Sequence, residues 1–185
     1  MRVRPFALAL LIVWALAPAA NAVQQAKSRY STIELGKCRA SGGKAWLCDG
    51  LPGYPVYVAR DGGRTFLSAG PGGASRRAAR QSLDAANTVF DGKSPRTAVE
   101  WRFVIRDKRV VPYATIVRYF TQTAGGRGEV VVVTRVSDQD TCQVARIDAL
   151  ANRDAMVLAR DIADRQARTF DCRQDPMNIG AAGKS

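Results

Sequence analysis

The chain contains no histidine, and this absence excludes more chemistry than any other feature of its composition. Histidine is the usual general base near neutral pH, the partner that activates a serine or cysteine nucleophile, and a common metal ligand. Glutamate is also scarce, because only Glu34, Glu100 and Glu129 are present. A carboxylate general acid needs a second carboxylate nearby and a perturbed environment, and no spacing around Glu100 supplies one. We therefore predict no catalytic residue.

Long apolar runs are missing from all but the beginning of the chain. The one such run covers residues 6–16, which is shorter than the ~20 residues that span a bilayer. It follows Arg2 and Arg4 and precedes the small residues Ala20 and Ala22, a pattern typical of a signal peptide with its cleavage site. Residues 1–22 are thus predicted to be a signal peptide, and the protein is expected in the periplasm or secreted, with no transmembrane anchor after cleavage.

Cysteine is infrequent, and no C-x-x-C motif occurs among the four cysteines. An even number of cysteines in an exported chain favours disulfides over a thiolate metal site or a redox-active pair. Three pairings are open. We favour Cys38–Cys48, across the turn signal at residues 41–43, and Cys142–Cys172, which would join a strand to the end of the following helix.

Alternating and continuous apolar residues predict a sheet over residues 97–137, around which the rest of the chain is expected to pack. Trp101, Phe103 and Ile105 alternate with other residues, as in a strand with one buried face. The four valines at 130–133 are typical of a strand that is buried on both faces. Further strands are expected at 32–38, 44–48, 55–60 and 64–68, the last two joined by the turn Asp61-Gly62-Gly63.

Two helices are expected, one from Arg76 to about Ala86, capped by Ser75, and one from Asn152 to about Thr169. The predicted fold class is therefore α+β: a mainly antiparallel sheet of about eight strands with two covering helices. Similar strand–strand–helix order in both halves also raises an internal ββββα duplication as a hypothesis.

The predicted domain organisation has four parts. A signal peptide at 1–22 and a loosely ordered segment at 23–31 precede a single globular domain at 32–172, and a disordered tail follows at 173–185.

A formal net charge of +12 favours attraction to anions. The glycine-rich loop before the first predicted helix could present free N–H groups to an anion, with arginines beside it. The hypothetical anion site comprises Gly72, Gly73, Ser75, Arg76, Arg77 and Arg80. The spacing matches neither a P-loop nor a dinucleotide fingerprint, and a solvated basic loop is the alternative interpretation.

Metal and cofactor binding are not predicted. Asp138 and Asp140 could offer carboxylates to calcium, but the segment lacks the other oxygen ligands and the glycine of a calcium loop. A turn between strands is the preferred interpretation.

The runs at 53–58, 112–120 and 147–152 resemble those of small exported bacterial proteins of unassigned function. The resemblance covers most of the chain after residue 22. It implies a bacterial envelope or secreted location, and it implies no activity and no catalytic residues.

Taken together, these patterns predict an exported, non-enzymatic binding or inhibitory module whose partner is an anionic polymer or an envelope protein. Two alternatives remain open: a carboxylate-dependent envelope hydrolase that uses Glu100, and a structural envelope protein without a ligand.

Overall fold

The computed structural model describes residues 25–182. The described part of the chain is mostly β, with 51% of its residues in strands, 15% in helical conformation, and two separate sheets. The predicted signal peptide lies outside the described residues. The predicted α+β fold with two covering helices is wrong, because a single helix of 13 residues is present in the described part of the chain.

The larger sheet has seven strands in the order β1-β7-β8-β9-β10-β11, with β6 paired to part of β8. All its pairs are antiparallel except β10 with β11. The bounds are β1 Lys27–Glu34, β6 Ala86–Thr88, β7 Arg96–Arg106, β8 Arg109–Thr123, β9 Gly126–Arg135, β10 Cys142–Asp148 and β11 Met177–Ile179.

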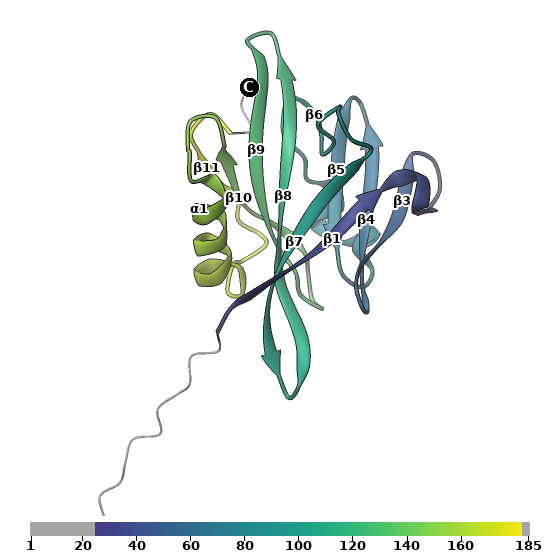
Figure 1. The fold of residues 1–185 in the computed structure, drawn as a ribbon, viewed down its shortest axis with the longest axis vertical. Helices are drawn as coiled ribbons and strands as arrows, with labels where there is room; N and C mark the ends of the chain where they lie inside the picture. Colours follow the sequence, from purple (N-terminus) through teal and green to yellow (C-terminus); the bar gives the residue numbers. More distant parts are fainter. Residues whose placement is uncertain (1–24, 183–185) are drawn as a thin grey trace, which may run out of the picture.

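The smaller sheet has four antiparallel strands in the order β2-β3-β4-β5. Their bounds are Arg39–Ala40, Ala45–Leu51, Tyr54–Asp61 and Arg64–Ala69. The predicted turn between β4 and β5 is present, and Gly62 and Gly63 take the positive φ angles, 53° and 74°, that a tight hairpin needs. The smaller sheet packs on one face of the larger sheet, and the helix α1 covers the other face (Figure 1).

The valine run of β9 confirms the prediction of a strand buried on both faces. Val130 and Val132 belong to the core between the two sheets, whereas Val131 and Val133 belong to the core beneath the helix. Successive side chains of a strand point to opposite faces. The larger sheet is therefore the middle layer of three.

The helical layer consists of α1, Ala155–Ile162, which continues into the π-helical turn η4, Ala163–Ala167. Alanines at 155, 159, 163 and 167 are buried against the sheet. Small side chains let the helix lie close to the strands, as its sequence pattern predicts.

The helix predicted from Arg76 to Ala86 does not form. The segment instead contains two short 3₁₀ turns, η2 Gly73–Ser75 and η3 Arg77–Arg80, followed by the strand β6. The amide of Ala78 donates to the carbonyl of Thr141 (2.7 Å). Because backbone groups of this segment bond to the β9–β10 connection, tertiary contacts override its helical propensity.

Three further expectations are corrected by the structure. The predicted ββββα duplication is absent, since the first half lacks a helix. Residues 27–31, expected to be loosely ordered, form most of β1, which pairs with β7. Residues 177–179, placed in the predicted disordered tail, form β11 beside β10.

Candidate functional site

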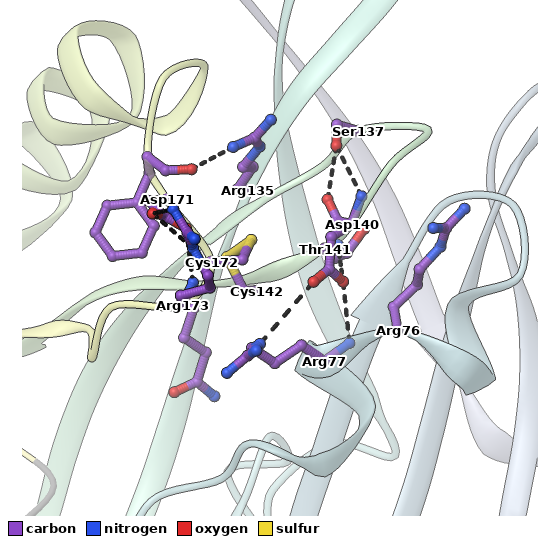
Figure 2. Close-up of a disulfide and its surroundings, with 12 residues drawn as sticks. Arg76, Arg77, Arg135, Ser137, Asp140, Thr141, Cys142, Asp171, Cys172 and Arg173 are labelled. Carbon is purple, nitrogen blue, oxygen red and sulfur yellow. Dashed lines mark hydrogen bonds and ion pairs between the residues drawn. A yellow bond between two sulfur atoms is a disulfide. The ribbon is translucent and has the colours of Figure 1, made fainter.

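The cysteines pair as Cys38–Cys48 and Cys142–Cys172, the pairing that the sequence favours. The first disulfide joins Cys38, which directly precedes β2, to Cys48 in β3. The second ties β10 to the segment that follows η4, so that the end of the helical layer is fixed to the sheet (Figure 2). Neither disulfide lies next to a free thiol, because the described residues contain no free cysteine.

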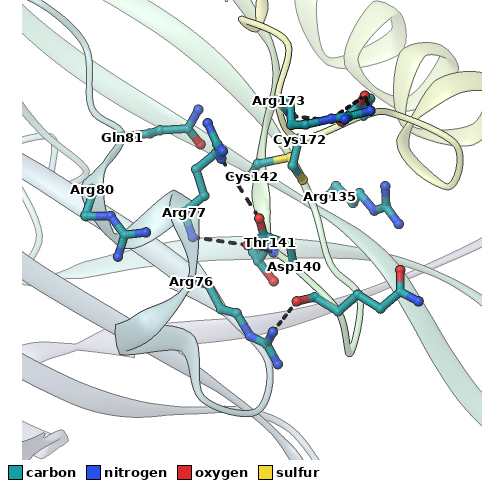
Figure 3. Close-up of polar contacts among 12 residues, drawn as sticks. Arg76, Arg77, Arg80, Gln81, Arg135, Asp140, Thr141, Cys142, Cys172 and Arg173 are labelled. Carbon is teal, nitrogen blue, oxygen red and sulfur yellow. Dashed lines mark hydrogen bonds and ion pairs between the residues drawn. A yellow bond between two sulfur atoms is a disulfide. The ribbon is translucent and has the colours of Figure 1, made fainter.

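The six residues of the hypothetical anion site lie together, and its three arginines form hydrogen bonds with other groups of the protein. The Arg76 guanidinium donates to the carbonyls of Asp138 (2.6 Å) and Gln139, both in the β9–β10 connection. Figure 3 shows Arg76 and Arg77 pointing toward this connection, next to Asp140 and Thr141. The Arg77 amide donates to Asp140 Oδ1 (3.2 Å), and Arg80 donates to the carbonyl of Ser75 (3.3 Å).

The glycines of this segment shape a turn instead of opening a helix. Gly72 has a φ of 67°, and the Ser75 hydroxyl donates to its carbonyl (2.9 Å). With only three residues, η2 has no row of aligned free N–H groups that could attract an anion. The anion site stays a prediction, and the geometry favours a link between the two sheets.

Asp138 and Asp140 lie in a turn, as the sequence analysis preferred. The Ser137 hydroxyl donates to the carbonyl of Asp140 (2.7 Å) and accepts from its amide (3.1 Å) (Figure 2). Among residues 25–182, no group of three or more histidine, cysteine, aspartate or glutamate side chains could hold a metal ion.

Glu100, the carboxylate of the hydrolase alternative, is only 1% exposed and holds the helix to the sheet. Arg160 of α1 donates from Nε to Glu100 Oε1 (2.8 Å) and from Nη2 to Oε2 (2.9 Å), and the Ser28 hydroxyl also donates to this carboxylate. Burial opposes ionisation, but the hydrogen bonds from Arg160 and Ser28 outweigh it and hold the pKa of Glu100 below its usual range.

A second carboxylate, Asp164, lies in the same network. Arg102 donates to its two oxygens at 2.9 and 2.5 Å, and the Tyr113 hydroxyl donates at 2.5 Å. Burial raises the pKa of Asp164, but these hydrogen bonds lower it by more. Tyr113 reaches Asp164 because the register shifts between Arg102 and Phe103 opposite it, which leaves Tyr113 as the extra residue of a bulge.

An open groove of about 900 Å³ lies on the helix-covered face of the larger sheet, beyond the helix. Its floor is formed by β6, β8 and β9. Cross-strand partners put Phe120 beside Glu129, and Gln122 beside Arg127, on this face. Loop residues also line the groove, among them Phe90, Lys93 and Leu150.

The groove carries more positive than negative side chains, and two of its cations form no ion pair in the described chain. Arg118 and Glu129 form an ion pair on the floor. Within residues 25–182, neither Lys93 nor Arg127 has an ion-pair partner. Asp91 instead accepts the amides of Lys93 (2.8 Å) and Ser94 (2.9 Å), and these hydrogen bonds lower its pKa.

Sequence reasoning missed this groove, although one signal was available. The alternation along β8 places Arg118, Phe120 and Gln122 on one face. The approach of the loop at 90–93 to that face depends on β6, whose Asn87 accepts the Thr65 amide of the smaller sheet (3.0 Å). No local pattern records that contact.

Comparison with protein-family models, with curated proteins and with solved structures finds no match to this chain. The geometry of the groove and the chemistry of its side chains therefore carry the functional argument. No helix among the described residues is long and apolar enough to cross a membrane.

Proposed function

We propose that the protein is an exported, non-enzymatic binding module that takes the anionic portion of an envelope or extracellular partner into the groove between β6, β8 and β9. The observation that carries the proposal is the groove itself, which Lys93 and Arg127, without ion-pair partners in the described chain, line together with Phe90 and Phe120. Cations of this kind attract anions, while the rings supply apolar contact area.

Location in the periplasm or outside the cell is part of the same proposal. The signal-peptide pattern of residues 1–22 supports export. The two disulfides are compatible with an oxidising compartment. An inhibitory role would follow if the partner were an enzyme whose anionic segment the groove covers.

The geometry does not favour the carboxylate-hydrolase alternative. Glu100 is buried and ion-paired, and the pKa values of both Glu100 and Asp164 are lowered. Neither carboxyl is therefore protonated near neutral pH, as a general acid must be.

Titration of the protein with a heparin oligosaccharide, followed by isothermal calorimetry, tests the proposal. Binding should weaken from low to high salt because exposed charges are screened. Lys93→Ala and Arg127→Ala should each weaken binding about fivefold at low salt, the effect of losing one close exposed charge contact.

Arg39→Ala is the matched control, since it removes one exposed positive charge from the smaller sheet. Melting temperatures of all three variants should stay near that of the unmodified protein. Equal losses of affinity in the control and the groove variants would show that only net charge matters, and would remove the groove from the proposal.

A further inference from the structure

The turn between β7 and β8 adopts a conformation that one of its two central residues, Lys108, disfavours. Asp107 and Lys108, its two central residues, have φ angles of 49° and 60° and are the only non-glycine residues with positive φ in the described chain. Asparagine or aspartate usually takes the first of these positions, and glycine usually takes the second, where this chain has Lys108. A lysine there strains the backbone, and such strain is more common at functional sites.

Like charges also face each other at this turn. Arg106 ends β7, Arg109 begins β8, and the two are direct cross-strand partners. Such a pair is destabilising. Together with Lys108 they form three exposed cations, and within residues 25–182 none of them has an ion-pair partner. The tip thus carries two unfavourable features, with no ion pair to offset them.

An apolar surface accompanies these cations. Ile105 is 46% exposed and pairs across the hairpin with Val110. Farther along the same face, Phe103 of β7 pairs with Lys27 of β1, and the Arg29 guanidinium lies 5.6 Å from the centre of the Phe103 ring. One exposed aliphatic side chain, that of Ile105, is therefore flanked by cations on both strands and on β1.

The hairpin is also placed for contact with a large surface. It extends past both the helix and the smaller sheet and forms one end of the described chain, opposite the β8–β9 hairpin (Figure 1). Because the groove is lined by the β8–β9 end of the same strands, the two surfaces can be altered independently.

We propose that this tip, residues 105–110, docks the protein on an anionic lipid surface. Arg106, Lys108 and Arg109 would contact the phosphate groups, and Ile105 would enter the boundary between headgroups and acyl chains. An exposed isoleucine favours a lipid surface over a charged polymer, which offers no apolar layer for it. The unfavourable turn conformation and the like-charge repulsion are then the cost of placing three cations at one point, as local rules are often broken at functional sites.

Co-sedimentation of the protein from residue 23 onward with vesicles tests the proposal. Vesicles that contain phosphatidylglycerol should bind the protein, and pure phosphatidylcholine vesicles should not. Removing all three cations in Arg106→Ala/Lys108→Ala/Arg109→Ala should lower the partition coefficient at least tenfold. The matched control Arg39→Ala/Lys44→Ala/Arg153→Ala, which removes three exposed cations elsewhere, should lower it much less.

Two single variants distinguish a loss of vesicle binding from a loss of stability and from a general effect of charge. Lys108→Gly should raise the melting temperature, because glycine tolerates the positive φ, and should lower vesicle binding about fivefold. Ile105→Ser should weaken vesicle binding but leave heparin binding unchanged. The groove variants Lys93→Ala and Arg127→Ala should retain most of the vesicle binding, so that failure of one proposal leaves the other intact.

Equal binding to anionic and neutral vesicles would overturn the proposal. So would unchanged vesicle binding by the triple tip variant, or an equal loss in the matched control. If the tip cations govern heparin binding and Ile105→Ser changes nothing, the partner is an anionic polymer and the lipid assignment is wrong.

Discussion

Gly50, in β3, illustrates a constraint that acts on a single residue. A Cβ atom added there would lie 2.2 Å from the Tyr54 carbonyl oxygen and 2.7 Å from Cζ2 of Trp101. Trp101 is itself fully buried between the sheets, and its indole N–H donates to the Ser31 hydroxyl (2.8 Å). The absence of a side chain at Gly50 therefore lets β3 pass next to this ring.

We expect Gly50→Ala to lower the free energy of unfolding by about 1–3 kcal/mol or more, because neither a carbonyl group nor a buried indole can move aside easily. Gly36→Ala is the matched control, since an added Cβ there would meet no atom within 4 Å. Its effect should stay within about 0.5 kcal/mol. Guanidinium unfolding at neutral pH measures both values, and similar results for the two variants would contradict the expected clash.

Burial of Trp101 is predictable from the alternation along its strand, but the constraint at Gly50 is not. The two residues are far apart in the sequence, and nothing near Gly50 indicates that an aromatic ring will lie against it. The exposure of Ile105 is likewise not evident from the sequence pattern. Ile105 shares the alternation of Trp101 and Phe103, yet it is half exposed, because it lies near the hairpin tip beyond both cores.

At the scale of secondary-structure elements, the docking of α1 on the sheet combines small apolar contacts with buried charge. Buried alanines form most of the contact, and the pairs Arg160–Glu100 and Arg102–Asp164 join helix and strand. A buried carboxylate must keep its hydrogen-bond donors, because an uncompensated buried charge is costly. These pairs fix the position of the helix along the strands.

Glu100→Gln should lower the free energy of unfolding by about 2 kcal/mol at pH 7, because Arg160 would lose a charged acceptor at a buried position. Asp161→Asn is the control on the same helix, since its ion pair with Arg165 is exposed, and its effect should be about 0.5 kcal/mol or less. Denaturant titrations give both values. If the two variants lose equal stability, Glu100 does not hold the helix in the way described.

The helix α1 was predictable because its apolar stripe matches a surface that the fold provides. The segment from Arg76 to Ala86 has similar local signals but forms 3₁₀ turns and a strand. The Gln81 carbonyl accepts from the Gln143 side chain there (3.3 Å), and the Ala78 amide donates to the Thr141 carbonyl. Its backbone is thus committed to a neighbour that is distant in the sequence.

At the scale of the whole molecule, the titration behaviour follows from lowered carboxyl pKa values and from the lack of histidine. The pKa values of Glu100 and Asp164 lie below their ordinary values in the folded chain. Groups of this kind stabilise the fold above their unfolded pKa values, about 4.3 and 3.9. That stability is lost as pH falls through the folded values. With no histidine, no side chain titrates at its ordinary pKa between about 5 and 8.

The melting temperature should therefore be nearly constant between about pH 5 and pH 8 and should fall steeply below about pH 4. Differential scanning calorimetry across this range measures it. In Glu100→Gln/Asp164→Asn the acid-side slope should be shallower, because two of the linked carboxyls are gone. A marked loss of stability between pH 8 and pH 6 would contradict the assignment.

The fold and the candidate site were thus predictable to different degrees. Local patterns are enough to indicate the disulfide pairing, the doubly buried valines of β9 and the covering helix α1, because each depends on neighbouring residues or on the periodicity of one strand or helix. The same patterns place Arg118 on a polar strand face, although they do not show that Glu129 is its partner.

The division of the strands into two sheets, the pairing of β1 with β7 and the position of the groove were settled by contacts between distant segments. Periodicity indicates that a face is buried, but not which surface buries it. The predicted anion site turned out to hold Arg76 against the β9–β10 connection, and the groove opens where β6 and the loop at 90–93 meet β8. Both results depend on how the sheets pack, and no short stretch of sequence carries that information.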